Sequence, residues 1–256
     1  MKVLKKIITF IVAGLIGFFM GIIVCNKTEQ INNDDVFILN DVFIPYEKEI
    51  IPKIEHIEGM TTNTFCELPV DIILQYPELP TGCEVTCLTM ALNYHGYDIS
   101  KTDLVDEYLL YRTDDYQVGF GGSPYSENGS SMWPPAIVDM INSFMEDNGD
   151  IRKGVDKTGT SLDSLLKCID EGSPIIVWVN EDFSTEIVYD NVELYYNNHT
   201  YKSYWNEHCV LIKGYDLDKN VVIINNPLIG EQEIDKDLFE EVYNICGKYA
   251  VVIDLI

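Results

Sequence analysis

The chain has 256 residues, of which 46% are hydrophobic, and this is enough for one hydrophobic core of ordinary size. Its 42 acidic side chains outnumber 17 Lys and Arg side chains, which gives a formal net charge of -25 at pH 7. An acidic surface repels phosphates, so binding of nucleic acid through a basic face is excluded. A soluble domain outside the cell and a basic partner are both compatible with this charge.

Residues 1–26 have the pattern of a membrane-targeting segment. Lys2, Lys5 and Lys6 precede an apolar, uncharged run over residues 7–25. As a helix this run would reach about 28 Å, close to the thickness of the bilayer core. Positive residues before a span keep the N-terminus in the cytoplasm. We expect an uncleaved signal-anchor, a single transmembrane helix at the cell membrane, with the remainder of the chain extracellular.

Two alternatives to the anchor stay open. A cleaved signal peptide would make the protein secreted, although no small-x-small cleavage site precedes Asn26. Cys25 could be a lipoprotein cysteine, but Val24 stands where a small residue is expected. Residues 27–66 show no persistent period and are interpreted as a spacer, or as a small docking element. Residues 67–256 form the predicted folded domain.

The central stretch of that domain is Gln75 to Gly96, which reads QYPELPTGCEVTCLTMALNYHG. A proline-rich loop carries Gln75 and ends at Cys83, and the residues that follow are apolar on nearly every face. This pattern predicts a buried helix that begins at Cys83 and stops before Gly96. Orphan N–H groups and the helix macrodipole stabilise an anion there. With a histidine close by, they are expected to lower the pKa of the Cys83 thiol.

Further helices and then strands follow. Ser100 and Asp103 form a capping pair, Pro134-Pro135 opens the next helix, and another covers residues 162–171. Apolar or alternating runs predict strands at residues 70–74, 175–179, 186–189, 192–196, 208–214, 221–225 and 250–255, with a helix at 235–245. A hairpin turn is expected at Asp190-Asn191. Helices first and strands later predict an α+β domain, with helices packed on one side of a mostly antiparallel sheet.

The second half of the chain supplies partners for Cys83. His208 opens the strand HCVLIKGY, and Asn226-Pro227 closes the next strand, so pairing would bring their side chains together. A cysteine on a helix, a histidine on a strand and an amide on the next strand make a papain-type triad of Cys83, His208 and Asn226. The Gln75 side chain and the Cys83 backbone N–H are expected to form the oxyanion hole.

These motifs resemble a known family. They are Gln75, PELPTGCE around Cys83, the GGSPYSENGSSMWPP loop, and the strands of His208 and Asn226-Pro227. Together they resemble cysteine peptidase family thirty-nine, which includes the bacteriocin-processing (double-glycine leader) peptidases, and especially its stand-alone, cell-envelope members in Gram-positive bacteria. The likeness covers roughly Leu68 to Leu255.

The resemblance implies a papain-like cysteine peptidase fold, no metal or cofactor, and Cys83, His208, Asn226 and Gln75 as the catalytic residues. One departure is Asn226-Pro227, where the family usually has Asp-Pro. Papain-type enzymes use Asn in this role, so the chemistry is retained while the imidazolium loses a countercharge. Nothing in the chain resembles the transporter part of leader-processing members, so a double-glycine substrate is not expected.

The sequence therefore predicts a monomeric thiol protease that hydrolyses peptide bonds at the outer cell surface. The candidates for substrate contact are Gly82, Tyr116, Tyr125 and Trp133; the three aromatic residues could instead pin the long loop over residues 113–133. The alternative function is a non-catalytic surface domain that binds peptide or cell-wall components. His199 is the substitute for His208 as base, and a metal site of Cys83, Cys87 and His208 is a weak reading without a second cysteine pair.

Overall fold

One sheet of eight strands lies at the centre of the computed structural model, which describes residues 24–25, 63–114 and 117–254. Its strands are β1 (Val24–Cys25), β2 (Phe65–Glu67), β5 (Lys153–Asp156), β6 (Ile175–Asn180), β9 (Glu207–Asp216), β10 (Val221–Asn226), β11 (Gly230–Asp235) and β12 (Ala250–Asp254). Small separate sheets pair β3 (Tyr111–Arg112) with β4 (Phe120–Gly121), and β7 (Tyr189–Tyr196) with β8 (His199–Tyr204). Every described pairing in the central sheet is antiparallel, as predicted.

Strand β9 is the longest strand of the central sheet and connects its parts. Its first residues pair with β6, from Glu207 opposite Asn180 to Ile212 opposite Ile175. Its last residues pair with β2, and β10 also pairs with it through Val221 opposite Asp216. Because β6 and most of β9 are buried on both faces, they read as continuous apolar runs rather than as alternating ones.

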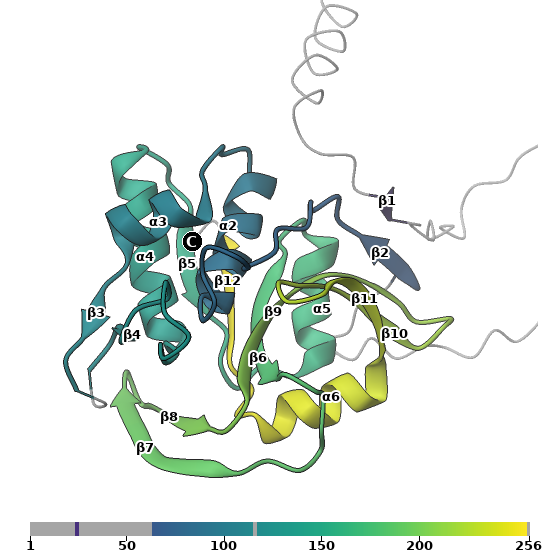
Figure 1. Cartoon of the computed structure of the whole chain (residues 1–256). Coiled ribbons are helices and arrows are strands. Elements are labelled where there is room, and N and C mark those ends of the chain that lie inside the picture. The colour runs from purple at the N-terminus through teal and green to yellow at the C-terminus, as the bar shows by residue number, and fades with distance from the viewer. Residues whose placement is uncertain (1–23, 26–62, 115–116, 255–256) are drawn as a thin grey trace, which may run out of the picture.

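Helices cover both faces of the sheet (Figure 1). On one side lie α2 (Cys83–Tyr94), α3 (Lys101–Tyr108) and α4 (Pro134–Asp147), and on the other lie α5 (Leu162–Asp170) and α6 (Lys236–Ile245). The prediction of helices on one side therefore holds for the first three helices only. The helices α5 and α6 each have an apolar stripe, with Leu165 and Phe239 fully buried. These stripes are buried against the second face of the sheet, which the first three helices leave uncovered.

Capping and turn chemistry explain several boundaries. The Ser100 hydroxyl accepts a hydrogen bond from the Asp103 N–H at 3.0 Å and begins α3, as predicted. The predicted turn at Asp190-Asn191 is wrong: these residues lie in a register shift within β7. The hairpin turns instead at Asn197-Asn198, whose φ values of 48° and 65° suit the left-handed turns that match strand twist.

The segment before Cys83 is irregular rather than the predicted strand over residues 70–74. Its polar groups bond to neighbouring elements: the Asn225 side chain donates to the Val70 carbonyl at 3.1 Å, and the Gln75 N–H donates to the Pro227 carbonyl at 2.8 Å. This segment is therefore attached to the end of β10, which places Gln75 beside the strand that carries Asn226.

The predicted membrane segment lies almost wholly outside the described residues. Its last two residues, Val24 and Cys25, form β1 and pair with β2. No helix among the described residues is both long and apolar enough to cross a bilayer. Strand β2 also shows that the folded domain includes Phe65 and Cys66, which the sequence interpretation placed in the spacer.

The loop between α3 and α4 is fastened next to Cys83. The Thr81 hydroxyl donates to the Ser126 carbonyl at 2.9 Å, and the Ser130 N–H donates to the Gly121 carbonyl at 2.7 Å. Gly129 allows this close approach, because a Cβ atom there would lie 2.1 Å from the Thr81 Oγ1 atom and 2.5 Å from the Ser123 carbonyl oxygen.

We expect Gly129→Ala to lower the free energy of unfolding by about 1–3 kcal/mol, because the added methyl group must displace backbone as well as the Thr81 side chain. Urea denaturation of the wild type and the variant measures this change. Glu127→Ala, at an exposed position of the same loop, is the control. Equal stability of the two variants would contradict this account of the loop.

Candidate active site

Cys83 is the first residue of α2 and follows a tight turn. The Gly82 N–H donates to the Leu79 carbonyl at 3.0 Å, and a Cβ atom on Gly82 would lie 2.7 Å from the Leu79 Cβ atom. Glycine is therefore needed for the chain to turn directly into the helix. Gly82 is the N-cap and makes no side-chain cap, so the first N–H groups of the helix, including that of Cys83, have no capping side chain.

His208 and Asn226 lie on the adjacent strands β9 and β10 and are joined by a hydrogen bond. The His208 Nε2 and Asn226 Oδ1 atoms are 2.9 Å apart, and both side chains are buried. Asn226 donates through Nδ2 to the Gln232 Oε1 atom at 2.9 Å, which fixes its oxygen toward the imidazole. His208 then carries its proton on Nε2 and keeps Nδ1 as an acceptor.

Gln75 is buried with its side-chain amide beside the turn before α2. Its Nε2 atom donates to the Pro80 carbonyl at 2.6 Å, whereas its Oε1 atom has no hydrogen-bond partner in the described part of the chain. The Lys101 ammonium donates to the Gln75 carbonyl at 2.8 Å and pairs with Glu78 at 2.7 Å. Contacts to α3 and to Pro227, directly after β10, therefore hold this residue in place.

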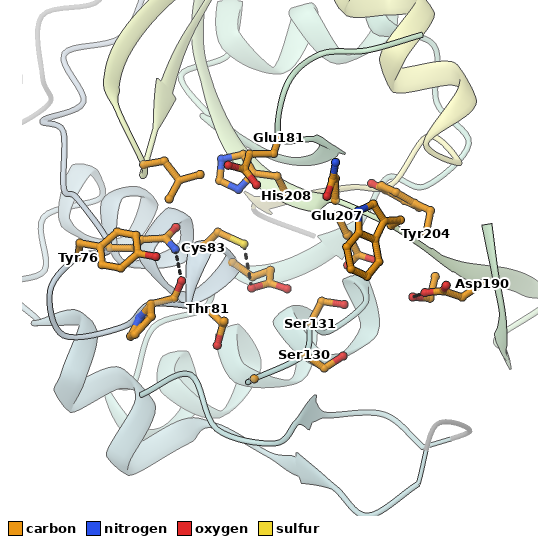
Figure 2. Close-up of a pocket in the computed structure, with 18 residues that line it drawn as sticks. Tyr76, Thr81, Cys83, Ser130, Ser131, Glu181, Asp190, Tyr204, Glu207 and His208 are labelled. Carbon is orange, nitrogen blue, oxygen red and sulfur yellow. Dashed lines mark hydrogen bonds between the residues drawn. The ribbon is translucent and has the colours of Figure 1, made fainter. Parts of the chain in front are cut away.

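A pocket of about 390 Å³ brings three of the four predicted catalytic residues together. Gln75, Cys83 and His208 line it, and Figure 2 shows Cys83 and His208 among the lining residues. Asn226 does not line the pocket but supports His208 through their hydrogen bond. Residues more than one hundred positions apart in the chain thus share one cavity.

Burial sets the protonation states of the thiol and the imidazole. It raises the pKa of the Cys83 thiol well above its usual value, and the neighbouring Glu84 raises it further. It also lowers the pKa of His208 to about 4, although the hydrogen bond that His208 donates to Asn226 acts in the opposite direction. The expected lowering of the thiol pKa by the helix N-terminus is therefore outweighed. At pH 7 the site holds a neutral thiol and a neutral imidazole.

Glu84 is a buried carboxyl group directly beside the thiol. Its Oε2 atom accepts a hydrogen bond from the Cys83 Sγ atom at 3.3 Å, and its Oε1 atom accepts one from the Met132 N–H at 3.0 Å. The Met132 carbonyl in turn accepts from Trp178 Nε1 at 3.0 Å, which links this group to β6. Burial raises the pKa of Glu84 to about 7, while the Met132 N–H lowers it.

None of the predicted substrate-contact residues that the structure describes lines this pocket. Tyr116 is outside the described residues, and Gly82, Tyr125 and Trp133 do not line the pocket. Tyr125 donates to Asp106 at 2.7 Å on the side of α3, and Trp133 is buried beneath the Arg112 guanidinium, 4.8 Å from the ring centroid. These contacts favour the alternative prediction for Tyr125 and Trp133, that their side chains hold the long loop in place.

Several pocket residues were missed by the sequence interpretation. They are Tyr76, Glu84, Glu181, Asp190, Trp205 and Glu207. Two of them carried a signal, because an acidic residue is the direct neighbour of both Cys83 and His208 in the sequence. The others come from turns and from β7, whose positions relative to Cys83 depend on the tertiary fold.

The described residues contain no group of three or more His, Cys, Asp and Glu side chains arranged to hold a metal ion. His199, the substitute base, lies on β8 and does not line the pocket. Besides Cys83, the thiols of Cys87, Cys168, Cys209 and Cys246 are free and buried, whereas Cys66 is disulfide-bonded.

Comparison with known proteins shows the family of this chain. Residues 67–251 match the model of the Peptidase_C39 like family. The chain belongs to this family. It is 31% identical over 198 residues to the uncharacterized protein YvpB of Bacillus subtilis (strain 168), covering 72% of this chain and 75% of the relative.

A solved structure from Bacillus anthracis, described as a "putative C39-like peptidase", superposes with a TM-score of 0.60 at 28% identity. The match covers 72% of this chain and 94% of the other. The chain therefore has the C39-like α+β fold with an antiparallel sheet, as the sequence resemblance predicted. Membership suggests a peptidase and a peptide substrate.

The raised pKa of the buried Glu207 carboxyl group leads to a prediction about the pH dependence of stability. Burial raises the pKa of Glu207 from its ordinary value of 4.5 to about 8. Between these two pH values the native protein keeps a proton on this carboxyl group that the unfolded chain has lost. The contribution of Glu207 to the free energy of unfolding is therefore fully present below pH 4.5 and is lost as the pH rises toward 8. Between pH 6.5 and 8, the titration of Glu207 is expected to lower the free energy of unfolding of the wild type by on the order of 1 kcal/mol. This contribution should be absent in Glu207→Gln.

Urea denaturation at several pH values measures this difference. Glu146→Gln, at an exposed position on α4, is the control and should retain the pH dependence of the wild type. His208 and His95, each with a pKa lowered to about 4, and Glu84, with a pKa raised to about 7, contribute to the pH dependence of the wild type and of both variants, so the effect of Glu207 is taken from the difference between the curves. Parallel curves for wild type and Glu207→Gln would contradict the prediction.

Proposed function

We propose that this protein is a cysteine peptidase that hydrolyses peptide bonds, with Cys83 as nucleophile and His208 as general base. The observation that carries the proposal is the His208–Asn226 hydrogen bond, which leaves the imidazole Nδ1 as an acceptor in a pocket shared with a thiol at a helix start. Asn226 orients the imidazole, and Gln75 with the Cys83 N–H receives the oxyanion.

The Cys83 thiol and the His208 imidazole are both neutral at pH 7, and this indicates how the proposed reaction starts. The Cys83 thiol, which donates to Glu84 in the resting site, turns toward His208 when a peptide carbonyl enters. Nδ1 of His208 takes the thiol proton as the sulfur bonds to the carbonyl carbon, so charge develops only during attack. A preformed ion pair is not needed, because burial of the site disfavours both charged forms.

The remaining steps use the same groups. The carbonyl oxygen becomes negative and accepts hydrogen bonds from the Cys83 N–H and from the second Nε2 hydrogen of Gln75, whose first hydrogen is bound to Pro80. His208 returns its proton to the leaving nitrogen as the C–N bond breaks. Water then attacks the thioester with His208 as base, releasing the acid product and restoring the thiol.

We expect Cys83→Ala to abolish cleavage of a diverse peptide pool, and Gln75→Ala to lower kcat/KM by about 10²–10³, because one oxyanion donor is lost. Mass spectrometry of the products measures both effects. Cys87→Ala, which removes a thiol one helical turn further along α2, is the matched control and should keep cleavage. Equal activity of Cys83→Ala and wild type would exclude this mechanism, and peptide binding without cleavage by wild type would favour a binding domain.

We also infer that the domain acts outside the cell, held by the apolar run predicted over residues 7–25, whose last two residues form β1. The support is the Lys-rich start followed by an apolar run, and the acidic composition of the chain. Because β1 begins at Val24 and pairs with β2, such an anchor would hold the domain close to the membrane surface.

Protease treatment of intact cells tests this location. External protease should remove the domain while a cytoplasmic marker stays intact, because the positive residues retain the N-terminus inside. A domain that is fully protected until the cells are lysed would contradict the proposal. A domain found in the culture medium would indicate secretion instead.

A further inference from the structure

One part of the pocket carries acidic and aromatic side chains that the proposed hydrolysis does not use. Glu181 follows β6, Asp190 lies on β7, Trp205 precedes β9, and Glu207 is the first residue of β9; all four line the pocket with Cys83 and His208. Figure 2 shows Glu207 between His208 and Asp190. The Glu181 N–H donates to the Asn206 carbonyl at 3.0 Å, so two of these segments are held side by side.

The carboxyl group of Glu207 is buried at the wall of this pocket. Both Oε1 and Oε2 are buried, and neither makes a hydrogen bond of standard geometry with any described residue. Burial and the nearby Glu84 raise its pKa, while the Ser131 hydroxyl and the Arg112 guanidinium act in the opposite direction. A buried acceptor without a donor is costly, so a ligand that donates to it would be bound favourably.

The charge of the pocket is one-sided. Among the 18 lining residues, four are Asp or Glu and none is Lys or Arg. The nearest guanidinium, that of Arg112, lies over the Trp133 ring and donates to Ser130 at 3.2 Å, and Arg112 does not line the pocket. With a net charge of -25 on the whole chain, the site attracts cations over a distance as well as at contact.

An exposed aromatic ring adds a second kind of cation contact. Trp205 is 70% exposed although it lines the pocket, and Tyr76, which also lines it, is 51% exposed. The faces of such rings attract ammonium and guanidinium groups. No described cluster of side chains is suited to a metal ion, so the expected cation is organic.

We infer that Glu207, Asp190, Glu181 and Trp205 form a subsite for a cationic side chain, the ammonium of lysine or the guanidinium of arginine in a peptide. Glu207 accepts hydrogen bonds from the cation, and Asp190 and Glu181 contribute charge at the more exposed edge. The assignment of this peptide as a substrate rests on the proposed hydrolysis, whereas the binding itself does not.

The test has a binding arm and a cleavage arm, both with the full chain. In the first, the Cys83→Ala variant is titrated with short random-sequence peptides of blocked termini, whose central residue is lysine, arginine, norleucine or glutamate. We expect the lysine and arginine pools to bind about tenfold more tightly than the norleucine pool, and Glu207→Gln to remove most of this advantage. Fluorescence anisotropy measures the apparent Kd.

The cleavage arm uses active protein on the same pools. Lysine and arginine should be enriched beside the cleaved bonds, and Glu207→Gln should lower kcat/KM for lysine peptides about tenfold while leaving norleucine peptides nearly unchanged. Asp190→Asn, at an exposed position, gives a second variant with little risk to folding, and should reduce the preference less. Glu146→Gln should match the parent in both arms.

The two arms separate the two proposals. Cleavage without preference for a cation, together with equal binding of all pools, would overturn the subsite and leave the peptidase intact. Selective, Glu207-dependent binding without cleavage by wild type would support the subsite and overturn hydrolysis. A preference that survives in both Glu207→Gln and Asp190→Asn would also overturn the subsite.

Discussion

The hydrogen bond between His208 and Asn226 is the interaction on which the rest of the candidate site depends. Asn226 is itself oriented by Gln232 from β11, so three consecutive strands determine which imidazole nitrogen faces the pocket. The end of β10 also holds the Gln75 segment, through the Pro227 carbonyl. One end of the sheet thus positions both the proposed base and the proposed oxyanion donor, while α2 supplies the thiol.

Burial is the second constraint, and it acts on every titratable group near the thiol. It disfavours charge on Cys83 and His208, and it also raises the pKa values of Glu84 and Glu207. The resting site is therefore poor in charge although acidic residues surround it. In the proposed reaction, charge appears at this site only when the imidazolium and the oxyanion form together during attack by Cys83. In the proposed subsite, a bound cation offsets the charge of a Glu207 carboxylate.

Local chemistry made much of the fold predictable. The buried helix from Cys83, the Ser100 cap, and the adjacent strands β9 and β10 all follow from apolar patterning and capping residues. The errors arose where two local signals compete. Asp190-Asn191 and Asn197-Asn198 both resemble turns, and cross-strand pairing of β7 with β8 selects the second. The irregular segment over residues 70–74 is stabilised by side-chain and backbone donors from distant elements, which apolar patterning does not reveal.

From its own residues, the chain specified the family resemblance, the helix that starts at Cys83, and a histidine and an asparagine that end on neighbouring strands. These features depend on spacing and local propensity, which are written in consecutive residues. The tertiary structure alone decided that Glu84 binds the thiol, that burial keeps the thiol and imidazole neutral, and that Glu207, Asp190 and Trp205 border the same cavity. Protonation depends on the surroundings that distant segments create, and no local pattern encodes those surroundings.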